Sequence, residues 1–188
     1  MNEKESLRAD IRRRKRMCAV EDLTRWSAAV CHRLRTDARW QSARCVLVYH
    51  PLADEVDVRP LLDESLAVGK RVLLPEVVGD DLRLRRYVGR DSLRRGAFGI
   101  WEPMGEALSV GDYPCVDVAV VPGMAFDADG HRLGRGRGYD DRLLPRLPKA
   151  YKIGVCFPFQ YVPRVPVTPD DVRMDAVICN DEGTRNNG

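Results

Sequence analysis

Several features that would assign this chain to a familiar class are missing from its sequence. No run of about 18 apolar residues occurs, so the sequence predicts no membrane-spanning helix. The six cysteines form no C-x-x-C pair, which argues against a zinc site. The formal net charge is only +3, too small to indicate nucleic-acid binding through overall electrostatics. The basic segment 1–16 is not followed by the apolar core of a secretory signal.

What is present indicates one folded domain. The chain has 188 residues, of which 44% are hydrophobic, and this is enough to fill one core. We expect a single domain over residues 1–188, with N-terminal helices over 1–36 packed on it and a frayed tail over 181–188. Several cysteines lie inside apolar runs such as CVLVY and IGVC, where thiols act as small core groups. We therefore expect a cytoplasmic protein, and a monomer.

Apolar periodicity predicts helices and strands in alternation. Helical spacing covers residues 3–35 with a break near 19–21, recurs over 58–68, and covers 139–147. Short apolar or alternating runs predict strands at 45–51, 71–77, 82–88, 116–123, 151–157 and 174–180. Strands separated by helical segments are typical of an α/β domain. We predict three layers, with a mostly parallel open sheet covered by helices on both faces, as in Rossmann-like folds.

The stretch RLGRGRGYDD, residues 132–141, follows the most apolar of these strands and precedes a helix. In an open α/β sheet, ligands bind beyond the carboxyl ends of the strands. Gly134, Gly136 and Gly138 let the backbone come close to a ligand, while Arg135 and Arg137 project between them. The pattern suits a polyphosphate, although its spacing matches neither the P-loop nor the dinucleotide motif. The alternative is a surface turn with solvated arginines.

The wider segment VPGMAFDADGHRLGRGRGYDDRLL resembles the signature of the 5-formyltetrahydrofolate cyclo-ligase family, V-P-G-x-x-F-D-x-x-G-x-R-L-G-x-G-x-G-Y-Y-D. Further blocks resemble the family in the same order, namely EKESLR, YHPLADEVD, FGIWEP and FPFQYVPRVPVTPDDVRMDAVIC. The resemblance implies an ATP- and Mg²⁺-dependent enzyme that closes 5-formyltetrahydrofolate to 5,10-methenyltetrahydrofolate and releases ADP and phosphate. Such phosphoryl transfer relies on positioning and charge neutralisation rather than on a protein nucleophile.

The resemblance also implies roles for individual residues on the nucleotide side. Arg132 and Arg137 are expected to be catalytic. Lys4 and Arg8 lie four residues apart, share one helix face, and are expected to bind ATP; a solvated basic helix is the alternative. The remaining residues expected to bind ATP form the loop Arg132, Leu133, Gly134, Arg135, Gly136, Arg137, Gly138 and Tyr139.

On the folate side, the resemblance implies contacts from His50, Glu55, Phe98 and Tyr139. Glu55 is expected to accept hydrogen bonds from the amino-pyrimidine edge of the substrate, whereas Phe98 is as well suited to the core. His50 stands where the family usually has an apolar residue, so we expect it to line the pocket.

The expected Mg²⁺ ligands are Asp141 and Asp175, because Mg²⁺ usually takes one or two carboxylates. The alternatives are a first-turn helix acid for Asp141 and a turn residue for Asp175. One departure from the signature is Asp140, which replaces its second tyrosine. This change either weakens nucleotide stacking or adds a metal ligand.

Two other functions fit parts of the sequence. A folate- or nucleotide-binding paralogue would keep the fold and pocket with lost or altered catalysis, and Asp140 is the residue that keeps this reading open. A small RNA-associated protein would use the basic N-terminal helix, but no aromatic residues are interleaved with the basic run. We therefore expect small-molecule substrates, reduced folate and ATP, and no nucleic-acid or membrane partner.

Overall fold

The computed structural model describes residues 1–180 and 184–186. Its main sheet has seven strands in the order β11-β10-β9-β6-β1-β2-β3. The five central strands pair in parallel, and the edge strands β3 and β11 pair antiparallel. The strands of this sheet are β1 (Cys45–Leu47), β2 (Arg71–Val78), β3 (Asp81–Arg86), β6 (Val118–Val121), β9 (Tyr151–Val155), β10 (Ala176–Ile178) and β11 (Thr184–Asn186).

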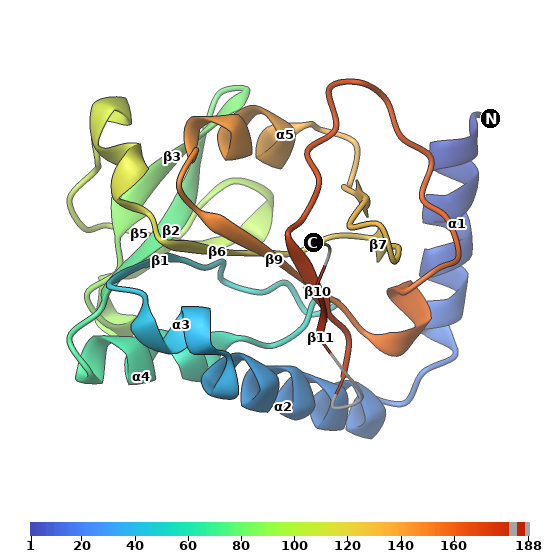
Figure 1. Ribbon diagram of the computed structural model, residues 1–188, viewed down its shortest axis with the longest axis horizontal. Helices are drawn as coiled ribbons and strands as arrows, with labels where there is room; N and C mark the ends of the chain where they lie inside the picture. The colour runs from blue at the N-terminus through green and yellow to red at the C-terminus, as the bar shows by residue number, and fades with distance from the viewer. Residues whose placement is uncertain (181–183, 187–188) are drawn as a thin grey trace.

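Helices cover both faces of this sheet, so the predicted three-layer α/β fold is confirmed (Figure 1). One face carries α2 (Val20–Thr36), α3 (Ala38–Ser42) and α4 (Arg59–Ala67), and the other carries α5 (Tyr139–Leu143). The strand β1 shows why both faces are filled. Val46 packs in the core cluster under α2 to α4, whereas Cys45 and Leu47 pack in the cluster under α5. Adjacent residues of a strand point to opposite faces, so a continuous apolar run supplies two cores.

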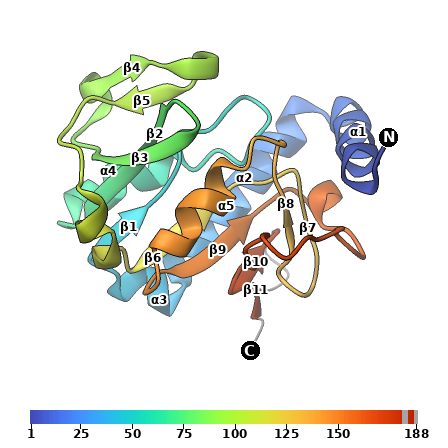
Figure 2. The same cartoon turned by 90° about the horizontal axis from the view of Figure 1, so that it is seen from above.

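The first helix, α1 (Glu3–Arg16), packs beside the sheet and not on it (Figure 2). Its buried Ile11 belongs to a small third core with Met124, Leu133 and Val165. This core joins α1 to a two-stranded hairpin, β7 (Ala125–Phe126) and β8 (Arg132–Leu133). The hairpin leads directly into the glycine-rich loop, residues 134–138, so α1 and the loop are positioned by the same packing.

A second hairpin stands apart from the sheet (Figure 2). It consists of β4 (Leu93–Arg95) and β5 (Trp101–Pro103), joined by the short 3₁₀ segment η2 (Ala97–Gly99). Two carboxylates tie the hairpin to β2. The buried Glu76 of β2 accepts a hydrogen bond from Arg94 of β4 at 3.1 Å, and Glu102 of β5 accepts one from the backbone N–H of Val77 at 2.6 Å. The remaining 3₁₀ segments are η1 (Arg90–Ser92), η3 (Val110–Cys115), η4 (Leu144–Arg146) and η5 (Pro158–Gln160).

The structure differs from the predicted secondary structure in two segments. The helix expected over 139–147 is α-helical only to Leu143 and continues as η4, since Pro145 cannot donate the backbone hydrogen bond of an α-helix. The frayed tail expected over 181–188 is wrong for Thr184–Asn186, which pair with β10; residues 181–183 and 187–188 lie outside the described residues. Within the described chain, no helix is both long enough and apolar enough to cross a membrane.

Candidate active site

A cavity of about 580 Å³ lies beyond the carboxyl ends of β1 and β6. This is the edge at which ligands of open α/β sheets bind. Elements far apart in the sequence line it: α1, the segment 50–55, the β4–β5 hairpin, the glycine-rich loop and the start of α5. The predicted site residues that line it are Lys4, Arg8, His50, Glu55, Phe98, Arg132, Gly134, Arg135, Gly136, Arg137, Gly138, Tyr139 and Asp141.

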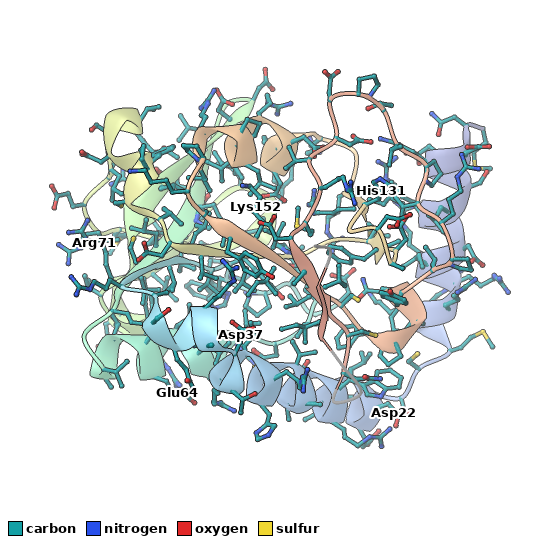
Figure 3. All side chains as sticks on the ribbon, in the orientation of Figure 1. Asp22, Asp37, Glu64, Arg71, His131 and Lys152 are labelled. Carbon is teal, nitrogen blue, oxygen red and sulfur yellow. The ribbon has the colours of Figure 1, made fainter. Side chains whose placement is uncertain are left out.

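Two predicted residues do not line this cavity. Leu133 is buried in the third core, where it pairs with Ala125. Asp175 precedes β10 and therefore lies at the opposite edge of the sheet. Its carboxylate accepts a hydrogen bond at 2.8 Å from the backbone N–H of Lys152, a residue of β9 that is labelled in Figure 3. The structure thus does not bring Asp175 together with Asp141, and the expected metal pair is wrong on this point.

The carboxylate that lies at the cavity in its place is Asp171, four residues earlier. Its Oδ2 accepts a hydrogen bond from Lys4 Nζ at 2.6 Å, and this contact lowers the pKa of Asp171 although burial acts to raise it. The sequence carried a signal for this assignment. Asp175 lies at the start of the predicted strand 174–180, and the start of a parallel strand is at the edge of the sheet opposite to the one where ligands bind.

The glycine-rich loop has a backbone that only glycine adopts without strain. Gly136 and Gly138 have φ values of 107° and 71°. Arg8 lies beneath the loop, with its Nε donating to the carbonyl oxygen of Gly134 at 2.8 Å. Arg8 is buried, so the alternative of a solvated basic helix is wrong for this residue. It supports the loop from within while its guanidinium borders the cavity.

Arg132 is fixed at two of its three nitrogens. Its Nε donates to the carbonyl oxygen of Pro122 at 2.6 Å, and its Nη2 donates to Asp140 Oδ2 at 2.6 Å. Its Nη1 lies 4.0 Å from Asp141 Oδ1. The side chain is only 6% exposed. A guanidinium held in this way is ready to stabilise negative charge with little reorganisation.

The structure thereby shows what the unusual Asp140 does. Its carboxylate is the partner of Arg132, in a position where the family signature has an aromatic ring. Burial raises the pKa of Asp140, and Arg132 opposes that rise. The carboxylate is therefore kept beside Arg132 by the ion pair, at a cost in desolvation.

Charged groups also link the glycine-rich loop to the segment 50–55. Arg135 Nη2 lies 2.6 Å from Asp54 Oδ1 and 3.8 Å from Glu55 Oε2. Lys15 of α1 holds the other oxygen of Asp54 at 2.6 Å. Glu55 Oε1 accepts a hydrogen bond from the N–H of Leu52 at 2.8 Å. Burial nevertheless raises the pKa of Glu55, so its carboxylate sits in a poorly solvated place where a hydrogen-bonding ligand would stabilise it.

Aromatic side chains supply the apolar part of the cavity. Phe98 is 54% exposed and has a left-handed φ of 57°, unusual for a residue other than glycine. This exposure rules out the alternative that Phe98 is a core residue. The guanidinium carbon of Arg137 lies 4.1 Å from the centre of its ring, and the ring of Tyr139 lies 6.5 Å away. The hairpin and the loop therefore meet through Phe98 and Arg137, at the mouth of the cavity.

His50 lies at the cavity immediately after β1. Its Nδ1 is buried and makes no hydrogen bond within the described part of the chain. Burial, followed by the charge of Arg59, lowers the pKa of His50. The imidazole is therefore biased to its neutral form, consistent with a lining role.

One group outside the cavity has the composition of a metal site. Asp127, Asp129 and His131 have ligand atoms within 4.8 Å of one another. The buried Asp127 accepts hydrogen bonds from the N–H groups of Asp129 and His131 at 3.0 Å each and of Val165 at 2.9 Å. These three hydrogen bonds give the Asp127 carboxylate a structural role, as the acceptor at the centre of a turn.

The fold and the cavity are those of an α/β enzyme whose site has a glycine- and arginine-rich loop on one side and a carboxylate beside aromatic rings on the other. The sequence model of the protein family described as the 5-formyltetrahydrofolate cyclo-ligase family matches residues 1–180. The chain therefore belongs to this family. The 5-formyltetrahydrofolate cyclo-ligase of Mus musculus is 28% identical, over 95% of this chain and 94% of its own. That of Escherichia coli (strain K12) is 30% identical, over 89% of this chain and 95% of its own. The NMR structure of Aquifex aeolicus 5,10-methenyltetrahydrofolate synthetase is 36% identical, covers 98% of this chain and 92% of that chain, and has a TM-score of 0.86.

Proposed function

We propose that this protein couples ATP hydrolysis to the closure of 5-formyltetrahydrofolate, giving 5,10-methenyltetrahydrofolate, ADP and phosphate. The observation that carries the proposal is that a single cavity is lined both by the glycine-rich loop with its fixed Arg132 and by Glu55 with the aromatic Phe98. The first set suits a polyphosphate and the second a polar heterocycle. Membership of the cyclo-ligase family supports this reading.

In the proposed reaction, the formyl oxygen of the folate takes the γ-phosphoryl group of ATP, and ADP leaves. The neighbouring anilino nitrogen then attacks the activated carbon, and phosphate departs with the former formyl oxygen. Negative charge is spread over the phosphoryl oxygens during the transfer. Arg132 is the group we assign to its stabilisation, because its guanidinium is already fixed by Pro122 and Asp140. Arg137, at the mouth of the cavity, is assigned a secondary role.

We assign ATP to the wall formed by Lys4, Arg8 and the loop 134–138. The folate is assigned to Glu55 and Phe98, with His50 lining the pocket and Tyr139 between the two substrates. Glu55 supports this orientation because its carboxylate is buried, at a cost that hydrogen bonds from an amino-pyrimidine edge would offset.

Asp141 has the properties of a Mg²⁺ ligand. Its carboxylate lines the cavity, and its ion-pair partner Arg132 Nη1 is 4.0 Å away, at the limit of such a contact. Carboxylate oxygens are the protein ligands that Mg²⁺ prefers. We propose Asp141 as the main ligand and Asp171 as the second carboxylate on this side. When bound, the ion would neutralise phosphate charge.

The test is a reconstitution with purified protein. The complete mixture of 5-formyltetrahydrofolate, ATP and Mg²⁺ should generate the near-ultraviolet absorbance of the methenyl product, with ADP and phosphate formed in step. Omission of any component should stop the reaction. Saturable folate binding without product would instead identify a folate-binding paralogue, and salt-sensitive retention on RNA without folate binding would identify an RNA-associated protein. We also propose that the protein acts in the cytoplasm, in keeping with its six free thiols.

A further inference from the structure

Two cysteines meet at the edge of the sheet opposite the cavity. Cys45 begins β1, and Cys115 ends η3 just before β6. Their Sγ atoms are 3.6 Å apart. The cavity lies beyond the carboxyl ends of the same two strands, so this thiol pair is separate from the candidate active site.

The two thiols differ in how they can be reached. Cys115 is half-buried, whereas Cys45 is only 5% exposed. Arg71 is exposed at the start of β2, at the outer edge of the molecule away from α1 (Figure 3), and its Nη1 lies 3.9 Å from the Sγ of Cys115. Burial, and then the neighbouring Cys115, raises the pKa of Cys45 to about 12. A dissolved reagent therefore meets Cys115 first, and Arg71 can stabilise the negative charge of its sulfur during attack.

We propose that Cys115 and Cys45 form a thiol–disulfide exchange site whose co-reactant is a small dissolved disulfide such as oxidised glutathione. The Cys115 thiolate attacks one sulfur of the reagent, whose S–S bond breaks to release one glutathione thiolate. Cys45 then gives its proton to the solvent, and its sulfur attacks Cys115 Sγ. The Cys45–Cys115 bond forms and the second glutathione leaves. The protein loses two electrons and two protons, and the reagent becomes two glutathione thiols.

The local geometry favours this closure. The sulfurs must approach by roughly 1.5 Å to reach the length of a disulfide, about 2.05 Å. The backbones beside them are already joined, because the N–H of Asp117 donates to the carbonyl oxygen of Cys45 at 2.9 Å. The Oδ2 of Asp117 also accepts a hydrogen bond from the N–H of Cys45 at 3.0 Å. The sulfurs can therefore meet through side-chain rotation, with the strands held in place.

The test uses the full-length, fully reduced protein and oxidised glutathione at neutral pH, followed by digestion without reductant and mass spectrometry. The wild-type protein should yield a linked Cys45–Cys115 peptide. Cys45→Ser should instead retain glutathione on Cys115, because the resolving thiol is gone. Cys115→Ser should leave Cys45 unmodified while the protein is folded. Cys18→Ser is the matched control, since Cys18 lies on another segment and its loss should not affect the linkage.

Two results would overturn the proposal. One is a wild-type protein that keeps glutathione on Cys115 and forms no linked peptide; the other is a folded Cys115→Ser variant in which Cys45 reacts equally fast. A separate readout is thermal unfolding. The linked protein should unfold at a higher temperature than the reduced one, because the bond constrains the unfolded chain across residues 46–114. Dithiothreitol should reverse this shift, and an unchanged or lower midpoint would contradict the proposed geometry.

Discussion

Removal of the Asp140 carboxylate tests whether this unusual residue works through Arg132. In Asp140→Ala, Arg132 Nη2 loses its 2.6 Å partner, but Nε keeps the Pro122 carbonyl. Loss of a preorganised charge donor typically costs about 10²- to 10³-fold in kcat. Asp140→Ala keeps Arg132 and its hydrogen bond to the Pro122 carbonyl. We therefore expect a smaller fall in kcat for this variant, about 10- to 100-fold. Asp140→Asn keeps an acceptor oxygen without the charge, so its kcat should lie between those of Asp140→Ala and the wild type.

The assay is a double-mutant cycle on the rate of methenyl-product formation, with Arg132→Ala, Asp140→Ala and the double variant. If Asp140 acts by holding Arg132, its removal should cost little once Arg132 is gone, with a coupling energy of about 1–3 kcal/mol. Asp91→Ala, in an exposed 3₁₀ turn away from the cavity, is the control for a lost surface carboxylate. Fully additive losses would show that Asp140 acts independently of Arg132, and the reasoning from the ion pair would then be refuted.

Three further changes test other parts of the site. Lys4→Ala should raise the apparent KM for ATP about tenfold, as expected for one charge-assisted contact; an unchanged KM with an intact circular-dichroism spectrum would remove Lys4 from the nucleotide site. Asp141→Asn should lose the Mg²⁺ response of turnover and keep folate binding, whereas Asp175→Ala should keep the Mg²⁺ response and unfold at a lower temperature because the backbone N–H of Lys152 loses its acceptor. Burial raises the pKa of Glu55 above 4.5, so its charge is lost earlier than usual as the pH falls. Folate affinity measured by calorimetry should therefore weaken on the acid side, and Glu55→Gln should bind weakly without that pH dependence. The effect on stability has the opposite sign, because a carboxyl with a raised folded-state pKa makes the protein less stable as the pH rises through it.

The sequence predicted the large elements because each carries its own pattern. The strands β1, β6 and β9 are apolar runs that must be buried on both faces, and α2 has a clear apolar stripe. The hairpin β7–β8 and the strand β11 were missed, since two or three residues are too few to show a period.

Within the site, the glycine-rich loop was recognisable because its residue types are rare together. The burial of Arg8 was not, since a basic helix beside a solvated face and one against a loop have the same local sequence. The ion pair of Arg132 with Asp140 depends on how β8 and α5 approach each other across the loop, which spacing does not reveal. Asp175 was misplaced for a different reason, because its position before β10 was outweighed by a motif match.

The contact between Lys4 and Asp171 joins residues 167 positions apart in the chain. Contacts of such sequence separation form late in folding, because the whole intervening loop must first be closed. During synthesis, the wall of the cavity near α1 stays incomplete until the ribosome has passed Asp171, when β10 and β11 are the strands of the described sheet that remain to be made. A prematurely terminated chain would therefore possess the glycine-rich loop and most of the sheet, yet lack the acidic partner that holds the first helix over the site.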